Sequence, residues 1–548
     1  MRFTRLGVAI FSRGTRWNKQ FVRQESTKTT TSSEKFERRK LPDDIPSFRE
    51  FIQQQNLGIG GVQQQIHPSS KSYFIETYGC QMNSSDTEIV ASIMQNSGYH
   101  RVEQPEIANV LMFNTCAVRE NAEQKVWERL KKIKSMLDNH PERRWRQRAS
   151  VGVLGCMAER LKKKLLETDR LVDFVAGPDA YRDIPNLLKA VESGQKAMNV
   201  QLSLEETYAD VAPVRFDGNG VSAYISIMRG CNNMCSYCVV PFTRGRERSR
   251  TLQSIVEEVK DLSARGYREI TLLGQNVNSY WDQTYAEGSG YLPYPGFNNI
   301  YKSRHGSGAR FIDLLDKVSA VDSRIRIRFT SPHPKDFPPQ LLQLIAERPN
   351  LCKSLHMPAQ SGSSSVLARM RRGYTREAYM QLIEEAKSTI PGLSISTDII
   401  TGFCGETEEE HKETLSLLEE VKFNQAYMYA YSERSHTHAK HNMPDDVPKE
   451  IKSRRLQEII STFREHAAES CMNELGKEHI VLIDGPSKRS SPEMPQLVGR
   501  TSTNKLCVWD VTNDEMNLSF SPGDYVLVKV LDANAATLKV QPLQKVVL

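Results

Sequence analysis

Three closely spaced cysteines constrain this chain more than any other feature. Cys231, Cys235 and Cys238 follow C-x3-C-x2-C spacing. A 4Fe–4S cluster has four irons, each usually bound by one thiolate, so three thiolates would leave one iron open. A structural zinc site is the alternative, but such sites close with four ligands, and the sequence offers no fourth Cys or His nearby. The spacing therefore favours an iron–sulfur loop with one open position.

A second set of three cysteines is spread along the first part of the chain. Cys80, Cys116 and Cys156 each follow a short apolar run, in turn 73–75, 110–113 and 151–154. Each cysteine is therefore expected where a strand gives way to a loop. Since the carboxyl ends of parallel strands meet at one edge of a sheet, the three thiols can converge. Three buried structural cysteines are the alternative for each position taken alone. Together, and ahead of the 231–238 loop, they favour a second open cluster.

The two sets and their surroundings resemble the radical SAM methylthiotransferases. The resemblance rests on the three separate cysteines, on Met228-Arg-Gly-Cys231 and on the run from Cys238 to Arg250, and it extends from about Lys71 to the C-terminus. Residues 274–280 and 244–250 are similar to the MiaB branch of that family, which acts on tRNA, and to its animal mitochondrial members in particular.

The resemblance implies a reaction and a set of cofactors and partners. The open iron of the 231–238 cluster would bind S-adenosylmethionine (SAM) and generate a 5′-deoxyadenosyl radical, while the second 4Fe–4S cluster would carry the sulfur. The implied substrate is N6-isopentenyladenosine at tRNA position 37, and the product is its 2-methylthio derivative. An electron donor of the ferredoxin or flavodoxin type and the iron–sulfur assembly machinery are the further partners implied, and a monomer is expected.

Composition agrees with a multidomain enzyme. A chain of 548 residues is too long for one ordinary core, and three domains are expected. Its mean hydropathy is −0.51, and no stretch of about 18 apolar residues would span a membrane. The net charge of +7 points weakly to a polyanionic partner. With six of ten cysteines assigned to metal, the composition argues against a disulfide framework and for a reducing compartment.

The first forty residues are basic and contain no acid before Glu25. Arginines alternate with apolar residues and are followed by serines and threonines, which is typical of a mitochondrial transit peptide. A disordered basic tail is the alternative. We therefore predict a transit peptide over 1–40, a location in the mitochondrial matrix, and a glutamine-rich linker over 41–70.

The rest of the chain predicts an α/β fold in three parts. Strands alternating with helical patterns over 71–195 predict a doubly wound α/β domain. Residues 217–466 predict a partial (β/α)6 radical SAM barrel, with a surface insertion at 288–308 and candidate strands at 223–228, 269–273, 324–329, 353–357, 393–400 and 425–431. Short strands separated by turns over 471–546 predict a small β-barrel that resembles the RNA-binding TRAM domain.

Several residues at predicted strand ends are candidates for the SAM pocket. The run from Thr397 to Glu406 resembles the SAM-contacting segment of the barrel, and no catalytic residue is predicted beyond the clusters. Many relatives have proline where this chain has Cys404, which is interpreted as a small buried residue rather than as a fourth ligand. His333 is as consistent with scaffold as with catalysis. The candidate SAM-pocket residues are Gly405, Glu406, Gln275, Ser331 and His356.

Basic residues near the loop and in the terminal barrel are candidates for RNA contact. In an extended conformation Arg244, Arg246, Arg248 and Arg250 would share one face and suit phosphate contacts. A second basic run at 143–148 is interpreted as a solvated helix face. From Cys471 onward eight Lys and Arg stand against nine Asp and Glu, so the barrel is not basic overall. Its candidate contacts are Lys488, Arg489, Arg500 and Lys505.

Two other functions fit parts of the pattern. The same chemistry on a ribosomal protein side chain is disfavoured by residues 274–280 and by the arginine-rich stretch. A kinase-regulatory binding protein without catalysis would be supported by loss of a cluster cysteine, but all six are present. The tRNA methylthiotransferase is the favoured hypothesis.

Overall fold

The computed structural model describes residues 71–547, apart from 118–119, 140–148, 169–170, 217–219, 287, 289–293, 299–305, 492 and 512–519. Residues 66–548 form one compact unit. The predictions of a transit peptide, of a linker and of a basic run at 143–148 lie outside the described residues, and so does much of the predicted insertion at 288–308.

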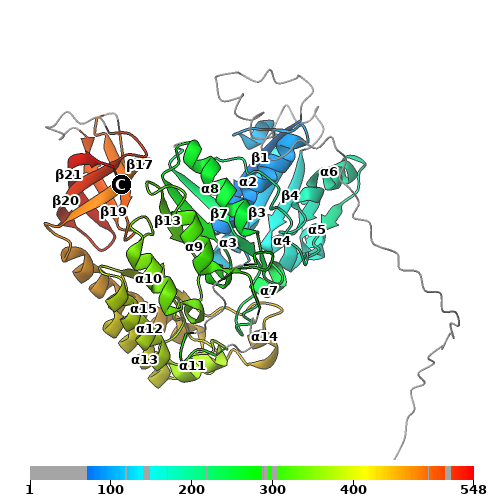
Figure 1. The fold of residues 1–548 in the computed structure, drawn as a ribbon. Helices are drawn as coiled ribbons and strands as arrows, with labels where there is room; N and C mark the ends of the chain where they lie inside the picture. Colours follow the sequence, from blue (N-terminus) through cyan, green and yellow to red (C-terminus); the bar gives the residue numbers. More distant parts are fainter. Residues whose placement is uncertain are drawn as a thin grey trace, which may run out of the picture. The chain divides into compact units, whose positions relative to one another are not determined.

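The first part of the unit is a parallel sheet of six strands in the order β2-β1-β3-β4-β5-β6 (Figure 1). The strands are β1 (Ser72–Thr77), β2 (His100–Arg101), β3 (Val110–Thr115), β4 (Ser150–Gly155), β5 (Phe174–Ala176) and β6 (Ala197–Asn199). The helices are α2 (Gln81–Asn96), α3 (Glu120–Asn139), α4 (Cys156–Leu161), α5 (Lys163–Thr168) and α6 (Ile184–Glu192).

Helices cover both faces of this sheet because its strands carry apolar side chains on both faces. In β3, Val110 and Met112 pack with α2 and α6, whereas Leu111 and Phe113 pack with α3, α4 and α5. Successive strand side chains point to opposite faces, so a run of buried apolar residues needs cover on each. The prediction of a doubly wound domain is confirmed.

The second part contains all six strands predicted for the barrel, with ends shifted by up to two residues. They form two parallel three-stranded groups, β13-β10-β7 and β14-β15-β16, which an isolated parallel bridge between Ile327 and Leu351 connects. The strands are β7 (Ser222–Ser226), β10 (Glu269–Leu273), β13 (Arg326–Phe329), β14 (Ser354–His356), β15 (Ser394–Thr401) and β16 (Gln425–Ala430). The short strands are β8 (Met228–Arg229), β9 (Arg248–Ser249), β11 (Trp281–Asp282) and β12 (Ala309–Arg310).

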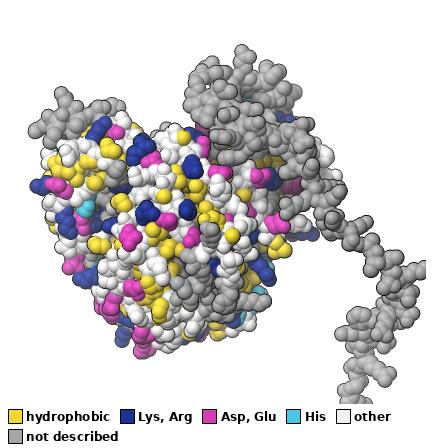
Figure 2. Space-filling model, viewed as in Figure 1, with side chains coloured by type: hydrophobic (Ala, Val, Ile, Leu, Met, Phe, Trp, Pro, Cys, Tyr) yellow, Lys and Arg dark blue, Asp and Glu magenta, His cyan; other side chains and the backbone are white. Residues whose placement is uncertain are grey.

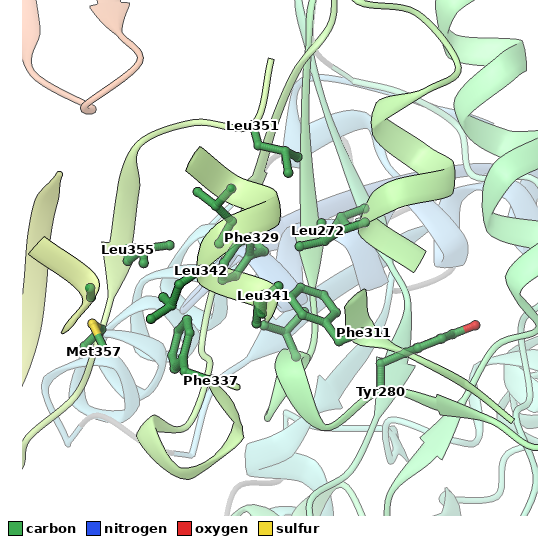
Figure 3. Packing of buried hydrophobic residues seen from close by; sticks show 14 of the residues in the cluster. Leu272, Tyr280, Phe311, Phe329, Phe337, Leu341, Leu342, Leu351, Leu355 and Met357 are labelled. Atoms are coloured by element: carbon green, nitrogen blue, oxygen red, sulfur yellow. The ribbon is translucent and has the colours of Figure 1, made fainter. Parts of the chain in front are cut away.

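Amphipathic helices bury the barrel's outer apolar side chains. Figure 3 shows Phe329 of β13 beside Leu341 and Leu342, which belong to one buried cluster with it. The helices of this part are α7 (Val240–Thr243), α8 (Leu252–Ala264), α9 (Phe311–Ser319), α10 (Pro339–Glu347), α11 (Ser364–Arg369), α12 (Arg376–Thr389), α13 (Glu408–Val421), α14 (His438–Asn442) and α15 (Lys449–Met472).

The last part is a closed five-stranded barrel, as predicted, in the order β17-β18-β19-β21-β20. The strands are β17 (Glu478–Pro486), β18 (Gln496–Thr501), β19 (Leu506–Asp510), β20 (Tyr525–Ala533) and β21 (Thr537–Val546). It contacts the (β/α)6 barrel through Arg326, whose guanidinium donates to the carbonyls of Arg500 and Ile480 at 2.6 and 2.7 Å.

Two predicted domain boundaries do not match the elements. The boundary at 195 leaves out β6, which pairs with β5, and the boundary at 466 falls inside α15, which continues to Met472. The three-domain division therefore stays a prediction whose edges need these adjustments. Among the described residues, no helix has the length and apolar character needed to cross a membrane.

Candidate active site

The three separate cysteines lie at the carboxyl ends of adjacent strands. Cys80 follows β1 and caps α2, Cys116 follows β3, and Cys156 follows β4 and begins α4. The thiols of Cys80 and Cys116 are hydrogen-bonded. Gly79 allows this approach, because a Cβ there would lie 2.5 Å from the Cβ of Cys116. Thr115 and Gly155, which directly precede Cys116 and Cys156, are paired across β3 and β4, so the three cysteines lie at one edge of the sheet as the sequence predicts.

The environment of Cys80 favours its thiolate. The hydrogen bond with Cys116, the charge of Arg244 and the backbone N–H groups of Met82 and Asn83 lower the pKa of Cys80 to about 6. The start of α2 contributes because a helix N-terminus stabilises negative charge. Burial instead raises the pKa of Cys156, although Arg244 opposes this rise. A thiolate is the form that binds iron, so this corner of the sheet is suited to metal.

The 231–238 loop lies at the carboxyl end of the first barrel strand. Gly230, which precedes it, has a φ of +76°, and a Cβ there would lie 2.1 Å from the carbonyl oxygen of Arg246. The Gly230 N–H donates to Oε1 of Gln275 at 2.5 Å. Burial and the neighbouring thiols raise the pKa of Cys231 to about 12, and burial with Cys235 does the same for Cys238. Cluster insertion must therefore displace protons here.

The two cysteine sets lie next to each other. Val239, which directly follows Cys238, packs with Cys156 and Ala117 in one buried cluster. Helix α7, which comes next, contacts α4, whose first residue is Cys156 (Figure 1). Arg244 at the end of α7 donates from Nε to the Cys156 sulfur at 3.0 Å. The residues that follow Cys238 therefore form part of the surroundings of Cys156.

A buried charge network joins the two parts of the site. Asp86 of α2 lies 2.7 Å from Arg244 Nη1 and 2.8 Å from Arg229 Nη2, and all three side chains are at most 3 % exposed. Asp86, Arg229 and Arg372 were not predicted from the sequence, and Arg372 donates to the Cys235 sulfur at 3.4 Å. No local spacing marks these residues, because the contacts that join them to the site span more than a hundred positions.

The candidate SAM-pocket residues lie at or just beyond the carboxyl ends of barrel strands. Gln275 holds the cluster loop through Gly230. Glu406 is 5 % exposed and accepts from the Gly402 N–H at 2.5 Å and from Arg455 at 2.9 Å, so its carboxylate braces the turn. The Gly405 N–H donates to Asp446 at 2.7 Å. Their roles toward SAM stay predictions.

The remaining candidates differ in exposure. Ser331 is exposed, with a φ of +58°, and His356 contacts Ser396 Oγ at 3.0 Å and Asp398 Oδ2 at 3.2 Å. His333 is buried, and burial lowers its pKa well below the ordinary value, which keeps the ring neutral. Cys404 packs in an apolar cluster with Phe403 and Tyr431, among others, which supports its interpretation as a small buried residue.

The arginines predicted to share one RNA-facing side do not do so. Arg244 is buried, and Arg248 is paired with Asp179 at 2.8 Å, so the proposed phosphate role is wrong for both in this conformation. The reason is that the stretch is not extended: Arg244 ends α7 and Gly245 has a φ of +73°. Arg246 alone of the alternating set is exposed.

The other candidates for RNA contact differ in exposure and in ion pairing. Lys488 and Arg489 are exposed between β17 and β18, Arg500 is half-exposed, and Lys505 is paired with Glu474 at 2.8 Å. Near the cluster loop, Phe242 is 37 % exposed. Its ring centroid lies 6.3 Å from that of His436. The face in Figure 2 carries basic side chains interspersed with acidic ones rather than in one patch.

The residues present fit two iron–sulfur clusters. In the described part of the chain no three Cys, His, Asp or Glu side chains are arranged around a single ion. A 4Fe–4S cluster does not need that arrangement, because each thiolate binds a different iron. Beside the 231–238 loop, the buried atoms Asn233 Nδ2 and Asn276 Oδ1 have no hydrogen-bond partner, which is consistent with a polar ligand there.

Comparisons with known proteins agree with this site. Residues 72–177 match the model described as uncharacterized protein family UPF0004, and residues 225–418 match the radical SAM superfamily. The mouse protein named mitochondrial tRNA methylthiotransferase CDK5RAP1 is 53% identical over 479 residues, covering 86% of this chain and 80% of its own.

A bacterial relative and a solved structure were also compared. The tRNA-2-methylthio-N(6)-dimethylallyladenosine synthase of Chloroherpeton thalassium is 50% identical over 465 residues, covering 85% of this chain and 94% of its own. The radical SAM methyltransferase TsrM from Kitasatospora setae, solved with tryptophan and a SAM analogue, is 13% identical. Its TM-score is 0.48, and the match covers 77% of this chain and 80% of the TsrM chain.

Proposed function

We propose the function of this chain from its family: it belongs to the radical SAM tRNA methylthiotransferases, and it is an enzyme that attaches a methylthio group to an adenosine of tRNA. Its cofactors are 4Fe–4S clusters and SAM. The relatives' names support N6-dimethylallyladenosine, which is N6-isopentenyladenosine, as the nucleoside. We further propose that this nucleoside lies at tRNA position 37.

The observation that carries this proposal is the contact between the two cysteine sets. The packing of Val239 on Cys156, with the hydrogen bond from Arg244, links the loop that would hold the SAM-binding cluster to the corner that would hold the second. When bound, the clusters and SAM supply the radical and the sulfur, which no protein side chain provides. One substrate carbon can then face both sources.

The chain's own residues hold this arrangement. Cys231, Cys235 and Cys238 would bind one cluster, and Cys80, Cys116 and Cys156 the other. The Gln275 side chain fixes the start of the first loop, and Arg372 donates to Cys235. The apolar residues Val239 and Ala117 fill the space beside Cys156 and limit the entry of water there.

The protein is mitochondrial, as the names of its relatives state for them, and we propose that it works in the matrix. A single electron must enter the SAM-binding cluster for each radical, so we propose a donor of the ferredoxin or flavodoxin type. Assembly of the clusters by dedicated machinery and a monomeric state stay predictions.

Mass spectrometry of mitochondrial tRNA tests the function. In cells without this protein, 2-methylthio-N6-isopentenyladenosine should be lost while its isopentenyladenosine precursor accumulates, and re-expression of the wild-type chain should restore it. An unchanged 2-methylthio content would contradict the proposal. A methylthio mark lost from a ribosomal polypeptide would indicate the protein-modifying alternative, and normal marks on both would favour the kinase-regulatory one.

We propose that Arg246, with Phe242 nearby, contacts the RNA. Arg246 is the exposed arginine of the loop that leaves the cluster, and exposed aromatic rings near a basic residue suit stacking with unpaired bases. Lys488, Arg489 and Arg500 of the terminal barrel are proposed as further phosphate contacts.

Replacing Arg246 with glutamine should weaken tRNA binding about equally across tRNA sequences and reduce the slope of log affinity against log salt by about one, as for loss of one phosphate contact. Filter binding at several salt concentrations measures this. Arg265→Gln is the matched control, because Arg265 is an exposed arginine at the end of α8, which precedes the amino end of β10. Equal effects of both variants would indicate general charge and refute a specific contact.

A further inference from the structure

Arg244 is a buried cation placed between the two cysteine sets. It is 2 % exposed, and all three of its guanidinium nitrogens are near partners. Nε donates to Cys156 Sγ at 3.0 Å, Nη2 donates to Asn83 Oδ1 at 3.2 Å, and Nη1 lies 2.7 Å from Asp86 Oδ2. A guanidinium always carries its charge, so a full positive charge is held against a cysteine sulfur inside the protein.

The position of Arg244 is set from both sides. Its N–H donates to the Val240 carbonyl at 2.8 Å, which ties it to α7 six residues after Cys238. Its carbonyl accepts from Arg248 Nη2 at 2.9 Å, and Arg248 is in turn paired with Asp179. The side chain is therefore aimed at Cys156 by a rigid segment and not by chance packing.

The contact of Arg244 with the sulfur is better directed than its contact with Asp86. Asp86 also lies 2.8 Å from Arg229, which has Glu206 at 3.6 Å as a second carboxylate. The Nη1 contact with Asp86 is close but off the direction of a hydrogen bond, since Nη1 has no hydrogen-bond partner among the described residues, whereas the Nε contact with sulfur is directed. The guanidinium therefore acts on the sulfur of Cys156 through a directed hydrogen bond as well as through its charge.

We propose that Arg244 is a positioning residue that orients Cys156 and raises the reduction potential of the cluster held by Cys80, Cys116 and Cys156. The inference rests on the second cluster of the proposed function. Hydrogen bonds to ligating sulfurs and nearby positive charge stabilise the more negative, reduced state of an iron–sulfur cluster. Arg244 sits on the segment that leaves the SAM-binding loop, so its contact also ties the state of one cluster to the placement of the other.

The test uses full-length protein with Cys231, Cys235 and Cys238 replaced by alanine, so that only the second cluster is loaded. Its reduction potential is measured by a redox titration followed by electron paramagnetic resonance, without SAM or tRNA. Arg244→Gln removes the charge, Arg244→Lys keeps it, and Arg326→Gln is the matched control. Arg326 is an equally buried arginine that donates to the carbonyls of Arg500 and Ile480 in the terminal barrel and not to a cysteine sulfur.

The expected result is a more negative potential in Arg244→Gln, an intermediate one in Arg244→Lys and an unchanged one in Arg326→Gln. Equal potentials in parent and Arg244→Gln, or equal shifts in Arg244→Gln and Arg326→Gln, would overturn the inference. So would failure of both Arg244 variants to load iron while Arg326→Gln loads it, since the role would then be structural. Absence of iron from the parent itself would instead contradict the second cluster and the proposed function.

Discussion

Alanine at Cys231, Cys235 and Cys238 is expected to lower the iron content of anaerobically prepared protein from about eight to about four per chain, as one of two four-iron clusters is lost. Methylthio transfer to tRNA should fall below detection, because the cluster that would bind and cleave SAM is lost with these thiolates. The remaining irons are expected to stay, since Cys80, Cys116 and Cys156 are positioned by the ends of β1, β3 and β4 and not by this loop.

Iron and sulfide analysis together with mass spectrometry of the product nucleoside measures this result. Cys352→Ala is the control, because Cys352 is a buried free cysteine outside both sets. Cys404→Ala tests the fourth-ligand idea and should keep all irons, since Cys404 lies in an apolar cluster. About four irons in the wild-type protein, all lost in the triple variant, would remove the second cluster from the reaction.

The parts of the site that the sequence predicted are those that depend on local pattern. The strand before each of Cys80, Cys116 and Cys156 is a short apolar run, and parallel strands bring their carboxyl ends to one edge. Neighbouring cysteines therefore follow once the strands are placed. The same holds for the candidates at the carboxyl ends of β10, β13, β14 and β15, which lie at or just beyond these strands, although their contact with SAM stays untested.

The predictions failed where the contacts of a residue depend on the direction of the backbone or on partners far away in the sequence. Alternating arginines share a face only in an extended chain, and the end of α7 with the positive φ of Gly245 turns Arg244 and Arg248 inward. Asp86 was missed because its partners are Arg229 and Arg244, far along the chain.

The shared carboxylate of Asp86 leads to the second large effect. Replacing Asp86 with alanine leaves the buried guanidinium of Arg244 without its carboxylate and that of Arg229 with only the more distant Glu206, at 3.6 Å. Removing one partner of a buried ion pair typically destabilises a protein by about 3–5 kcal/mol. We expect a loss of this size in cluster-free protein, seen as a lower urea midpoint. The control Glu469→Ala should barely move the midpoint, since its pair with Lys422 is half-exposed.

A double substitution distinguishes the loss of an ion pair from the creation of a cavity. If orphaned charge is the cause, Asp86→Ala combined with Arg244→Leu should be less unstable than the sum of the two single variants, because a cation with no carboxylate has been removed. If the loss comes from an unfilled cavity at α2, the two effects should add, and the charge explanation is then wrong. The sub-additive result would mean that Asp86 is retained to hold two arginines between the cysteine sets, so the stability of this corner and the placement of its sulfurs depend on the same carboxylate.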